Sequence, residues 1–308
     1  MALLRAALAS LVLCCAVQSA LAMSAVARLP RARGRPLLRA PATCRPHAQS
    51  MLLAPAGVVL AGQFAPSLPV ALSLNTVLCG AALLKGQKAL TPAGLFNAWI
   101  LGVVLWATMG GSAWLICVIY LVGGTAVTKV GKAKKEALGI SEGRGGMRGP
   151  ENVWGSAATA AICALLTVVL PEQAMLLQLG YVASLATKLS DTFASEIGKA
   201  YGRTTYLITT FQLVPKGTEG AISLEGTVAG VGGSLIIALA AYLMTPPMIS
   251  PLGVGLSLVA AFVACNCESL IGATAQDKVP WLTNEMVNFF NTAIGAVVAI
   301  GLQLAFFK

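Results

Sequence analysis

Charged residues and histidine are scarce in this sequence. Only 10% of its 308 residues are charged, and its single histidine, His47, lies among the first 50 residues. Without histidine, residues 51–308 cannot use an imidazole as a general base, nucleophile or metal ligand, which excludes Ser-His-Asp hydrolases and His-based metal centres. Among the eight cysteines, Cys265 and Cys267 have no histidine or second cysteine pair near them, so their spacing favours packing at a helix end over a zinc site.

Acidic residues are absent from the N-terminal region. Residues 1–50 contain seven Arg and no Asp or Glu, which leaves 14 basic and 11 acidic residues in 51–308. The net charge of +10 therefore comes mainly from the first 50 residues. A surplus of only +3 in the remainder does not indicate a basic surface for nucleic acid, and we exclude nucleic acid as a partner.

Residues 1–50 are typical of a cleavable targeting leader. Residues 1–23 have an early arginine, an apolar core and Ala20-Leu21-Ala22, which matches the small-x-small pattern of signal peptidase sites. Residues 24–50 are rich in Arg, Ala, Pro and Ser and lack acids, as transit peptides do. This order resembles the two-part presequence of nuclear-encoded plastid proteins and predicts a plastid location, which together with the apolar segments described next predicts a multi-pass plastid membrane protein. One long plastid or mitochondrial leader is the alternative.

Long apolar segments dominate the rest of the chain. Hydrophobic side chains make up 57% of the sequence, and its mean hydropathy is +0.80. A bilayer core of about 30 Å requires about 20 apolar residues in a helix. Segments of this kind lie at 66–84, 89–109, 111–128, 153–171, 173–189, 225–245, 248–265 and 287–307. We therefore expect residues 51–308 to form one all-α domain, a polytopic helical membrane protein with about 7–9 transmembrane helices.

The connecting segments divide unequally between the two sides of such a bundle. Alternating the spans places 85–88, 129–152, 190–224 and 266–286 on one side. With the foot of the fifth span and Glu225 at the start of the sixth, this side receives 13 of the 14 basic and 10 of the 11 acidic residues of 51–308. The positive-inside rule predicts that it faces the stroma or an equivalent compartment. All the candidate catalytic groups would then share one aqueous surface.

The fifth span ends in an unusually charged stripe. At about 100° per residue, one helix face would carry Lys188, Asp191, Thr192, Ser195, Lys199 and Gly202. Ionisable groups at a membrane boundary are costly and often functional, so the stripe indicates a site rather than only a ladder of salt bridges. Asp191 is an oxygen ligand suited to Mg²⁺, and Lys188, Lys199 and Arg203 suit phosphate oxygens. Glu196 could be a second carboxylate on the metal or a partner of Arg203.

Two glycine-rich loops on the same side could bind an anion. Lys216 lies in a turn between Pro215 and Gly217, and Thr218 adds a hydroxyl, although the sequence departs from the Walker phosphate loop. In the loop 129–152, glycines would let Arg144, Arg148 and Asn152 close over a ligand. The lysines of that loop fit a topogenic basic tract, namely Lys129, Lys132, Lys134 and Lys135.

The segment before the last span adds further polar candidates. These are Glu268, Asp277, Asn284 and Asn288, which suit sugar or metal contacts. Asn at a helix start is as often a cap.

Several motifs resemble known lipid-modifying enzymes. Ser190-Asp191-Thr192-x-Ala194-x-x-x-Gly198-x-x-x-Gly202 followed by Pro215-Lys216-Gly217-Thr218-Glu219-Gly220 resembles a pattern of CTP-dependent polyprenol kinases and CDP-diacylglycerol synthases. Further motifs are Glu142-Gly143-Arg144-Gly145-Gly146-x-Arg148-Gly149, Asp277 and Thr283-Asn284-x-x-Val287-Asn288. With them, residues 70–308 resemble the integral-membrane family of the plant plastid phytyl-phosphate kinase of the vitamin E pathway. Where that family has Asp-Ser-Leu-Leu-Gly, this chain has Glu268-Ser269-Leu270-Ile271-Gly272, a longer carboxylate that puts the metal geometry there in doubt.

The resemblance implies a phosphotransferase with a lipid substrate. It would move the γ-phosphate of a nucleoside triphosphate, CTP being favoured, onto phytyl monophosphate with the help of Mg²⁺, and the phytyl diphosphate would serve tocopherol and phylloquinone synthesis. The expected catalytic residues are Asp191, Lys188 and Lys199. The expected nucleotide- and phosphate-binding residues are Arg144, Arg148, Asn152, Arg203, Lys216, Thr218 and Asn284. The expected metal ligands are Asp191, Glu196, Asp277 and Glu268.

Three alternative functions remain open at this point. A phytol or polyprenol kinase, or a cytidylyltransferase acting on a related lipid, would use the same nucleotide site with another acceptor. An ion-coupled transporter would use Asp191 and Lys188 as a relay, and would be expected to bury its charges near the middle of the bilayer. The sequence does not indicate an oligomeric state.

Overall fold

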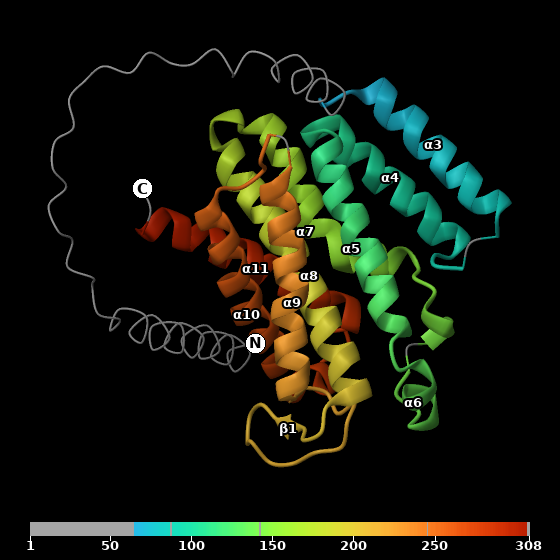
Figure 1. Cartoon of the computed structure of the whole chain (residues 1–308), viewed down its shortest axis with the longest axis vertical. Helices are drawn as coiled ribbons and strands as arrows, with labels where there is room; N and C mark the ends of the chain where they lie inside the picture. The colour runs from blue at the N-terminus through green and yellow to red at the C-terminus, as the bar shows by residue number, and fades with distance from the viewer. Residues whose placement is uncertain (1–64, 87, 142, 245, 307–308) are drawn as a thin grey trace, which may run out of the picture. The chain divides into compact units, whose positions relative to one another are not determined.

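The described part of the chain is almost entirely helical (Figure 1). The computed structural model describes residues 65–86, 88–141, 143–244 and 246–306, all within one compact unit, Ala61–Lys308, and the predicted leader lies outside them. The α-helices are α3 (Leu68–Leu84), α4 (Pro92–Met109), α5 (Gly111–Lys129), α6 (Lys132–Ala137), α7 (Pro150–Val169), α8 (Ala174–Tyr201), α9 (Leu224–Leu243), α10 (Pro251–Thr274) and α11 (Asn284–Phe306). Short 3₁₀ turns occupy Gly143–Gly146, Pro171–Gln173 and Gln276–Lys278.

Each of the predicted spans coincides with a helix. Within the described residues, six helices are long and apolar enough to cross a membrane, namely α4, α5, α7, α9, α10 and α11, and α3 is a shorter apolar helix. The protein is therefore a multi-pass helical membrane protein, as predicted. The helix that contains most of the predicted span 248–265 continues beyond it to Thr274. Its last turns leave the apolar span but still bury Ile271 and Gly272 against the protein, which stabilises them as helix.

Helix α8 is the centre of the bundle. It packs against α5, α7, α9, α10 and α11 and buries Tyr181, Leu185 and Leu189 completely. The Tyr181 hydroxyl donates to the Ala113 carbonyl oxygen of α5 at 2.6 Å, so the one polar atom of this buried ring is satisfied. With 28 residues, α8 is about 42 Å long, more than a bilayer core of about 30 Å requires. The helix therefore continues beyond the apolar layer at one end, as the sequence predicted.

Small residues bring α9 close to α8. Gly226, Gly230 and Gly233 lie along the side of α9 that faces α8. A Cβ atom added to Gly226 would lie 2.6 Å from the Ala194 carbonyl oxygen, and one added to Gly233 would lie 2.8 Å from the Leu189 carbonyl oxygen. Within membranes, such close backbone contact replaces the hydrophobic effect as the force that associates helices. The spacing of these glycines thus fixes α9 beside the polar stripe of α8.

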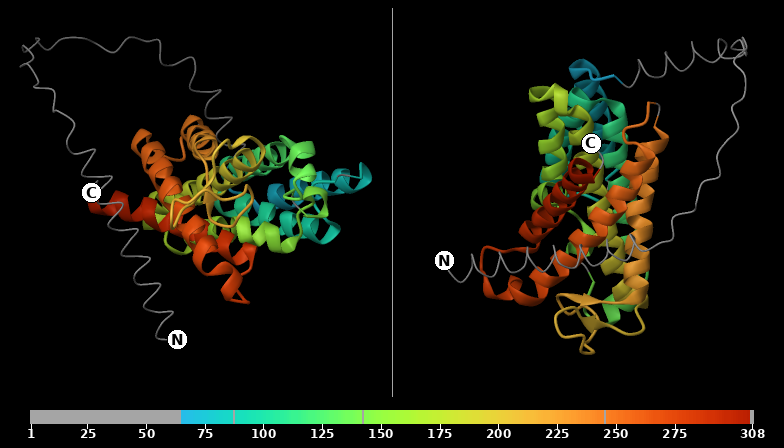
Figure 2. Two further views of the ribbon diagram at one scale, coloured as in Figure 1. Left: turned by 90° about the horizontal axis from the view of Figure 1, so that it is seen from below. Right: turned by 90° about the vertical axis from the view of Figure 1, so that its left-hand side faces the viewer.

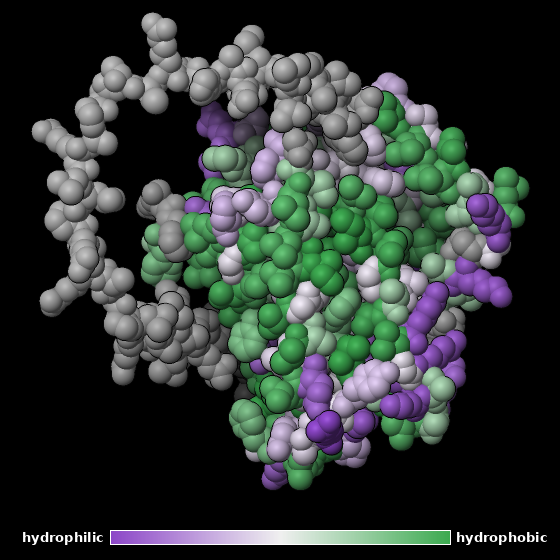
Figure 3. Space-filling view, viewed as in Figure 1, coloured by the Kyte–Doolittle hydropathy of each residue, from purple (hydrophilic) through white to green (hydrophobic). Residues whose placement is uncertain are grey.

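The connecting segments predicted to share one side do meet at one end of the bundle. Arg148 lies beside the 89–91 segment, where its backbone N–H donates to the Ala89 carbonyl oxygen at 3.0 Å. Strand β1 (Tyr206–Leu207) pairs antiparallel with β2 (Ala221–Ile222), and β2 contacts α10. Figure 2 shows this hairpin beyond the ends of α8 and α9. In Figure 3 hydrophilic residues gather around this end, whereas the face over α5 and α9 is mainly hydrophobic.

Candidate functional site

A cavity of about 490 Å³ lies where these segments meet. Helices α7, α8, α9, α10 and α11 and the segments 143–148 and 216–223 line it. The cavity contains most of the residues predicted from the sequence, namely Lys188, Asp191, Glu196, Lys199, Arg148, Asn152, Lys216, Thr218, Glu268 and Asn284. Asn152, Glu268 and Asn284 lie within two turns of the ends of their helices. The polar cavity is therefore at the rim of the bundle rather than at its centre.

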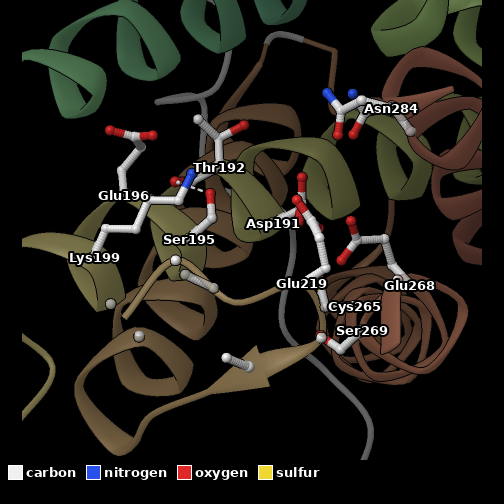
Figure 4. Close-up of a pocket in the computed structure, with 18 of the residues that line it drawn as sticks. Asp191, Thr192, Ser195, Glu196, Lys199, Glu219, Cys265, Glu268, Ser269 and Asn284 are labelled. Carbon is white, nitrogen blue, oxygen red and sulfur yellow. Dashed lines mark hydrogen bonds between the residues drawn. The ribbon is translucent and has the colours of Figure 1, made fainter. Parts of the chain in front are cut away.

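The polar face of α8 forms one wall of the cavity. Lys188, Asp191, Thr192, Ser195 and Lys199 all line it, as their helical spacing predicted. The Lys188 ammonium donates to Asp191 Oδ2 at 2.5 Å and to Asn288 Oδ1 of α11 at 2.7 Å. Two acceptors from different helices thus hold a mostly buried ammonium in place, and Asp191 lines the cavity (Figure 4).

Glu196 and Arg203 do not interact as one of the sequence hypotheses proposed. Glu196 Oε2 accepts from the Lys135 ammonium, and Lys135 also donates to the Thr128 carbonyl oxygen at 2.7 Å. Both side chains are buried, with 2% of each exposed. Arg203 is 92% exposed, its Nε lies 4.0 Å from Glu225 Oε1, and it does not line the cavity. The interpretation of Lys135 as part of a topogenic tract was incomplete, because this lysine joins α6 to α8.

Arg148 and Asn152 anchor the loop before α7 on the cavity wall. Arg148 Nη1 donates to the Tyr120 hydroxyl of α5 at 2.9 Å, and its guanidinium lies near the face of that ring. Asn152 Oδ1 accepts from the Gly149 N–H at 3.0 Å and so caps α7, while its Nδ2 donates to Glu285 Oε1 at 3.1 Å. The side chains of Arg144 and Asp277 lie outside the part of the chain that is described, so their predicted roles stay predictions.

The Lys216 loop is the tight turn that its sequence predicted. Gly217 and Gly220 adopt φ angles of +85° and +74°, a left-handed conformation that a side chain disfavours. At Gly220 a Cβ atom would also lie 2.5 Å from the Ser269 carbonyl oxygen, so glycine is required for contact with α10. The Thr218 hydroxyl donates to the Pro215 carbonyl oxygen at 2.8 Å. These contacts hold Lys216 and Glu219 over the cavity.

Three carboxylates converge from different elements. Asp191 of α8, Glu219 of the Lys216 loop and Glu268 of α10 point toward one another (Figure 4). Among the described residues, no three His, Cys, Asp or Glu side chains form a complete metal-binding group. Mg²⁺ in phosphoryl-transfer sites is usually held by one or two carboxylates and the substrate's phosphates. The arrangement therefore suits Mg²⁺ that arrives with a nucleotide, and not a metal ion caged by protein alone.

Sequence reasoning assigned no site role to Glu219 or Lys135. Glu219 could have been selected, because it belongs to the Pro215-Lys216-Gly217-Thr218-Glu219-Gly220 motif that carries the resemblance. Lys135 could not, because it stands in a run of lysines and its burial depends on α6, a helix that the spans did not predict. Asn288 was expected to contact sugar or metal, and in the structure it orients Lys188.

Comparison with known proteins identifies the family. The integral membrane protein family DUF92 matches residues 75–296. "Uncharacterized membrane protein sll0875" of Synechocystis sp. is 54% identical over 76% of this chain and 90% of its own length. "Protein VTE6, chloroplastic" of Arabidopsis thaliana is 45% identical over 70% of this chain but only 65% of its own length. "Uncharacterized membrane protein MJ0933" of Methanocaldococcus jannaschii is 32% identical over 73% of this chain and 90% of its own.

No solved structure matches this chain. The relatives nevertheless confirm, at the level of the family, the resemblance that the sequence motifs predicted. The chain belongs to the integral membrane protein family DUF92.

Proposed function

We propose that this protein is a prenyl-phosphate kinase that transfers the γ-phosphoryl group of a nucleoside triphosphate to phytyl monophosphate. One observation carries the proposal: three lysines and three carboxylates line the same cavity at the rim of a transmembrane bundle. The lysines are Lys188, Lys199 and Lys216, and the carboxylates are those of Asp191, Glu219 and Glu268. Two phosphorylated substrates would meet there, and the lysines would offset the repulsion between their phosphates.

The proposed reaction forms one P–O bond and breaks another. An oxygen of the prenyl monophosphate would attack the γ-phosphorus, and the bond from that phosphorus to the β–γ bridging oxygen would break, so that the nucleoside diphosphate leaves with this oxygen. Lys188 and Lys199 on α8 would bind the transferring phosphoryl group, and Arg148, Asn152 and Asn284 the nucleotide. Lys216 would reach the phosphates from its glycine turn.

Magnesium fits this proposal as a partner of the nucleotide. Asp191 and Glu268 would hold it, with Glu219 beside them, and when bound it would neutralise charge on the phosphate oxygens. Glu196 is less suited than these residues, because its carboxylate is already bound by Lys135. The longer side chain of Glu268, compared with the Asp of the family pattern, still reaches the cavity.

The absence of histidine favours a phosphate acceptor over an alcohol. A phosphate monoester has a second pKa of about 6 and is mostly deprotonated at neutral pH, so its oxygen needs no general base. An alcohol such as phytol would require one. Residues 51–308 contain no histidine, and Asp191 forms an ion pair with Lys188. Both observations support the monophosphate as the acceptor.

The cellular role follows from the same proposal. Phytyl diphosphate would serve tocopherol and phylloquinone synthesis, and the protein would reside in a plastid membrane with the cavity facing the stroma. The leader composition and the chloroplastic relative support this location. A nucleotide preference for CTP rests only on the motifs shared with CTP-dependent polyprenol kinases.

The three alternative functions differ in how well the site supports them. A cytidylyltransferase or polyprenol kinase is favoured by the Pro215–Gly220 loop, which resembles theirs. A transporter is disfavoured, because the charged cavity lies at the rim of the bundle.

A panel of donors and acceptors tests the proposal. Purified protein is incubated with labelled CTP, ATP, GTP or UTP, each with phytol, phytyl monophosphate or dolichol, with and without Mg²⁺. We expect a diphosphate made only from the monophosphate, dependent on Mg²⁺ and lost in Asp191→Ala. A monophosphate made from an alcohol, or a cytidylyl-lipid, would assign the alternative enzyme. Ion flux in liposomes without nucleotide binding would assign the transporter.

A further inference from the structure

A second, smaller cavity opens beside the first. It has a volume of about 60 Å³ and lies between α8, α9 and α10. It shares part of its lining with the main cavity, namely Ala194, Ile222, Thr227, Cys265 and Ser269. The two cavities are therefore adjacent, and we call the smaller one the α9–α10 groove. The main cavity is mostly polar, whereas the groove is mostly apolar.

The groove runs from the rim into the membrane layer. On α9 its lining extends from Thr227 to Ser234, and on α10 from Ser269 back to Leu258. At 1.5 Å per residue these stretches are about 10 Å and 16 Å long. Both helices are apolar enough to span a membrane. The groove thus leads from the charged site toward the bilayer interior.

Three of its polar side chains donate to the backbone of their own helices. Thr227 Oγ1 donates to the Ser223 carbonyl oxygen, Ser234 Oγ to the Val231 carbonyl oxygen and Asn266 Nδ2 to the Phe262 carbonyl oxygen, at 3.0, 2.9 and 2.7 Å. Because these donors bind their own helix backbone, they do not require a polar ligand. The groove can therefore accept a hydrocarbon.

The outer edge of the groove faces lipid. Val231 of α9 and Phe262 of α10 line it and are 43% and 50% exposed on helices that span the membrane. These two side chains come from the two helices that give the groove its name. A chain that left the main cavity along the groove would emerge between them into the bilayer.

We propose that the α9–α10 groove holds the part of the prenyl chain nearest the phosphate and directs the remainder into the bilayer between Val231 and Phe262. This inference rests on the proposed function. A volume of about 60 Å³ holds only a small part of a C20 chain, since one water takes about 30 Å³. The groove would therefore select the structure next to the phosphate, whereas the far end of the chain would remain in lipid and its length would matter little.

Tryptophan substitutions at the outer edge test this inference. We expect Val231→Trp and Phe262→Trp to raise KM for phytyl monophosphate about tenfold, the change expected when burial of about two CH₂ groups is lost. KM for the nucleotide should stay unchanged. Turnover of dimethylallyl monophosphate, which is too short to reach the edge, should also persist.

The controls are Ile236→Trp on α9 and Val259→Trp on α10, which are 45% and 50% exposed but line neither cavity. Equal KM values for phytyl monophosphate in the edge and control variants would contradict the proposal that the groove holds the prenyl chain.

Photolabelling separates this inference from the kinase proposal. A phytyl monophosphate with a diazirine just beyond its first isoprene unit is added to the wild-type protein in vesicles, and labelled peptides are mapped. Labels at Val231 and Phe262 support the groove even if no phosphoryl transfer is found, in which case only the kinase proposal fails. Labels on helices other than α8, α9 and α10 would contradict the proposed role of the groove even if the protein is an active kinase.

Discussion

Two lysine–carboxylate pairs on α8 have similar chemistry and different surroundings. Lys188 and Asp191 pair within the helix at the wall of the main cavity, where Asn288 binds the same ammonium. Glu196 also lines the cavity, but its carboxylate is bound by Lys135 from α6, and this pair is sealed from solvent, with 2% of each side chain exposed. The Lys188 and Asp191 side chains are 9% and 13% exposed. A sealed pair has its charges neutralised by each other and holds two segments together, whereas a more exposed pair can exchange its partner for a ligand. The comparison therefore favours Lys188–Asp191 for the proposed reaction and Lys135–Glu196 for the fold.

The largest expected effect on kcat is at the Lys188–Asp191 pair in the main cavity. Asp191→Asn keeps the shape of the side chain but removes the charge that would hold Mg²⁺, so we expect phosphoryl transfer to fall about 10²- to 10³-fold, the usual effect of losing one preorganised electrostatic group. The measurement is kcat with labelled nucleotide and phytyl monophosphate. Glu225→Gln, which removes the carboxylate near exposed Arg203, is the control and should keep near-normal activity. An Asp191→Asn protein as active as this control would remove Asp191 from the mechanism.

At the sealed pair we expect a loss of stability instead. Glu196→Gln leaves the Lys135 ammonium buried without its counter-ion, which costs about 3–5 kcal/mol and should lower the melting temperature by about 6–20 °C. Thermal unfolding in detergent measures this shift. The matched control is Lys132→Gln on the same short helix, because Lys132 pairs with Glu136 at 3.7 Å on the surface.

A double variant then tests the cause of that loss. Lys135→Met with Glu196→Leu removes both buried charges and should recover much of the stability lost in the single variant. If Glu196→Gln unfolds at the wild-type temperature but stops catalysis, the sealed pair belongs to the reaction and the comparison is wrong.

A smaller effect is expected at Asn288, which positions Lys188. Asn288→Ala removes one acceptor from the ammonium, and a hydrogen bond to a charged group contributes about 1.5–3 kcal/mol. We expect kcat to fall at least about tenfold, with little change in KM for the nucleotide. Asn288→Asp retains an acceptor and should recover part of kcat. A rise in KM with kcat unchanged would instead indicate that Asn288 binds substrate directly.

The smallest effect is expected at Arg203, which the sequence placed in the site and the structure does not. Arg203→Ala should change kcat/KM less than about threefold, because an exposed ion pair contributes about 0–1 kcal/mol. Steady-state kinetics with varied nucleotide measures this. A tenfold rise in KM for the nucleotide would show that Arg203 moves into the cavity when nucleotide binds.

Features that depend on residues close together in the sequence could be predicted, and features that depend on contacts between distant segments could not. The spans, the shared side of the loops and the stripe of α8 could be read from the sequence, because each depends on local hydropathy or on the 3.6-residue period of one helix. The turn at Lys216 was likewise predictable from its flanking proline and glycine. The pairing of Lys135 with Glu196 and of Arg203 with Glu225 could not be predicted, because these partners lie far away in the chain or in an unpredicted element.

The sequence by itself determined that this is a multi-pass helical membrane protein of the DUF92 family with its polar motifs at one end. The tertiary structure alone decided which charges face the cavity, which are sealed inside the protein, and where an apolar groove leads from the cavity into the bilayer. The physical reason is that burial and pairing of a charge depend on side chains brought together from separate helices, which hydropathy and periodicity within one helix do not specify.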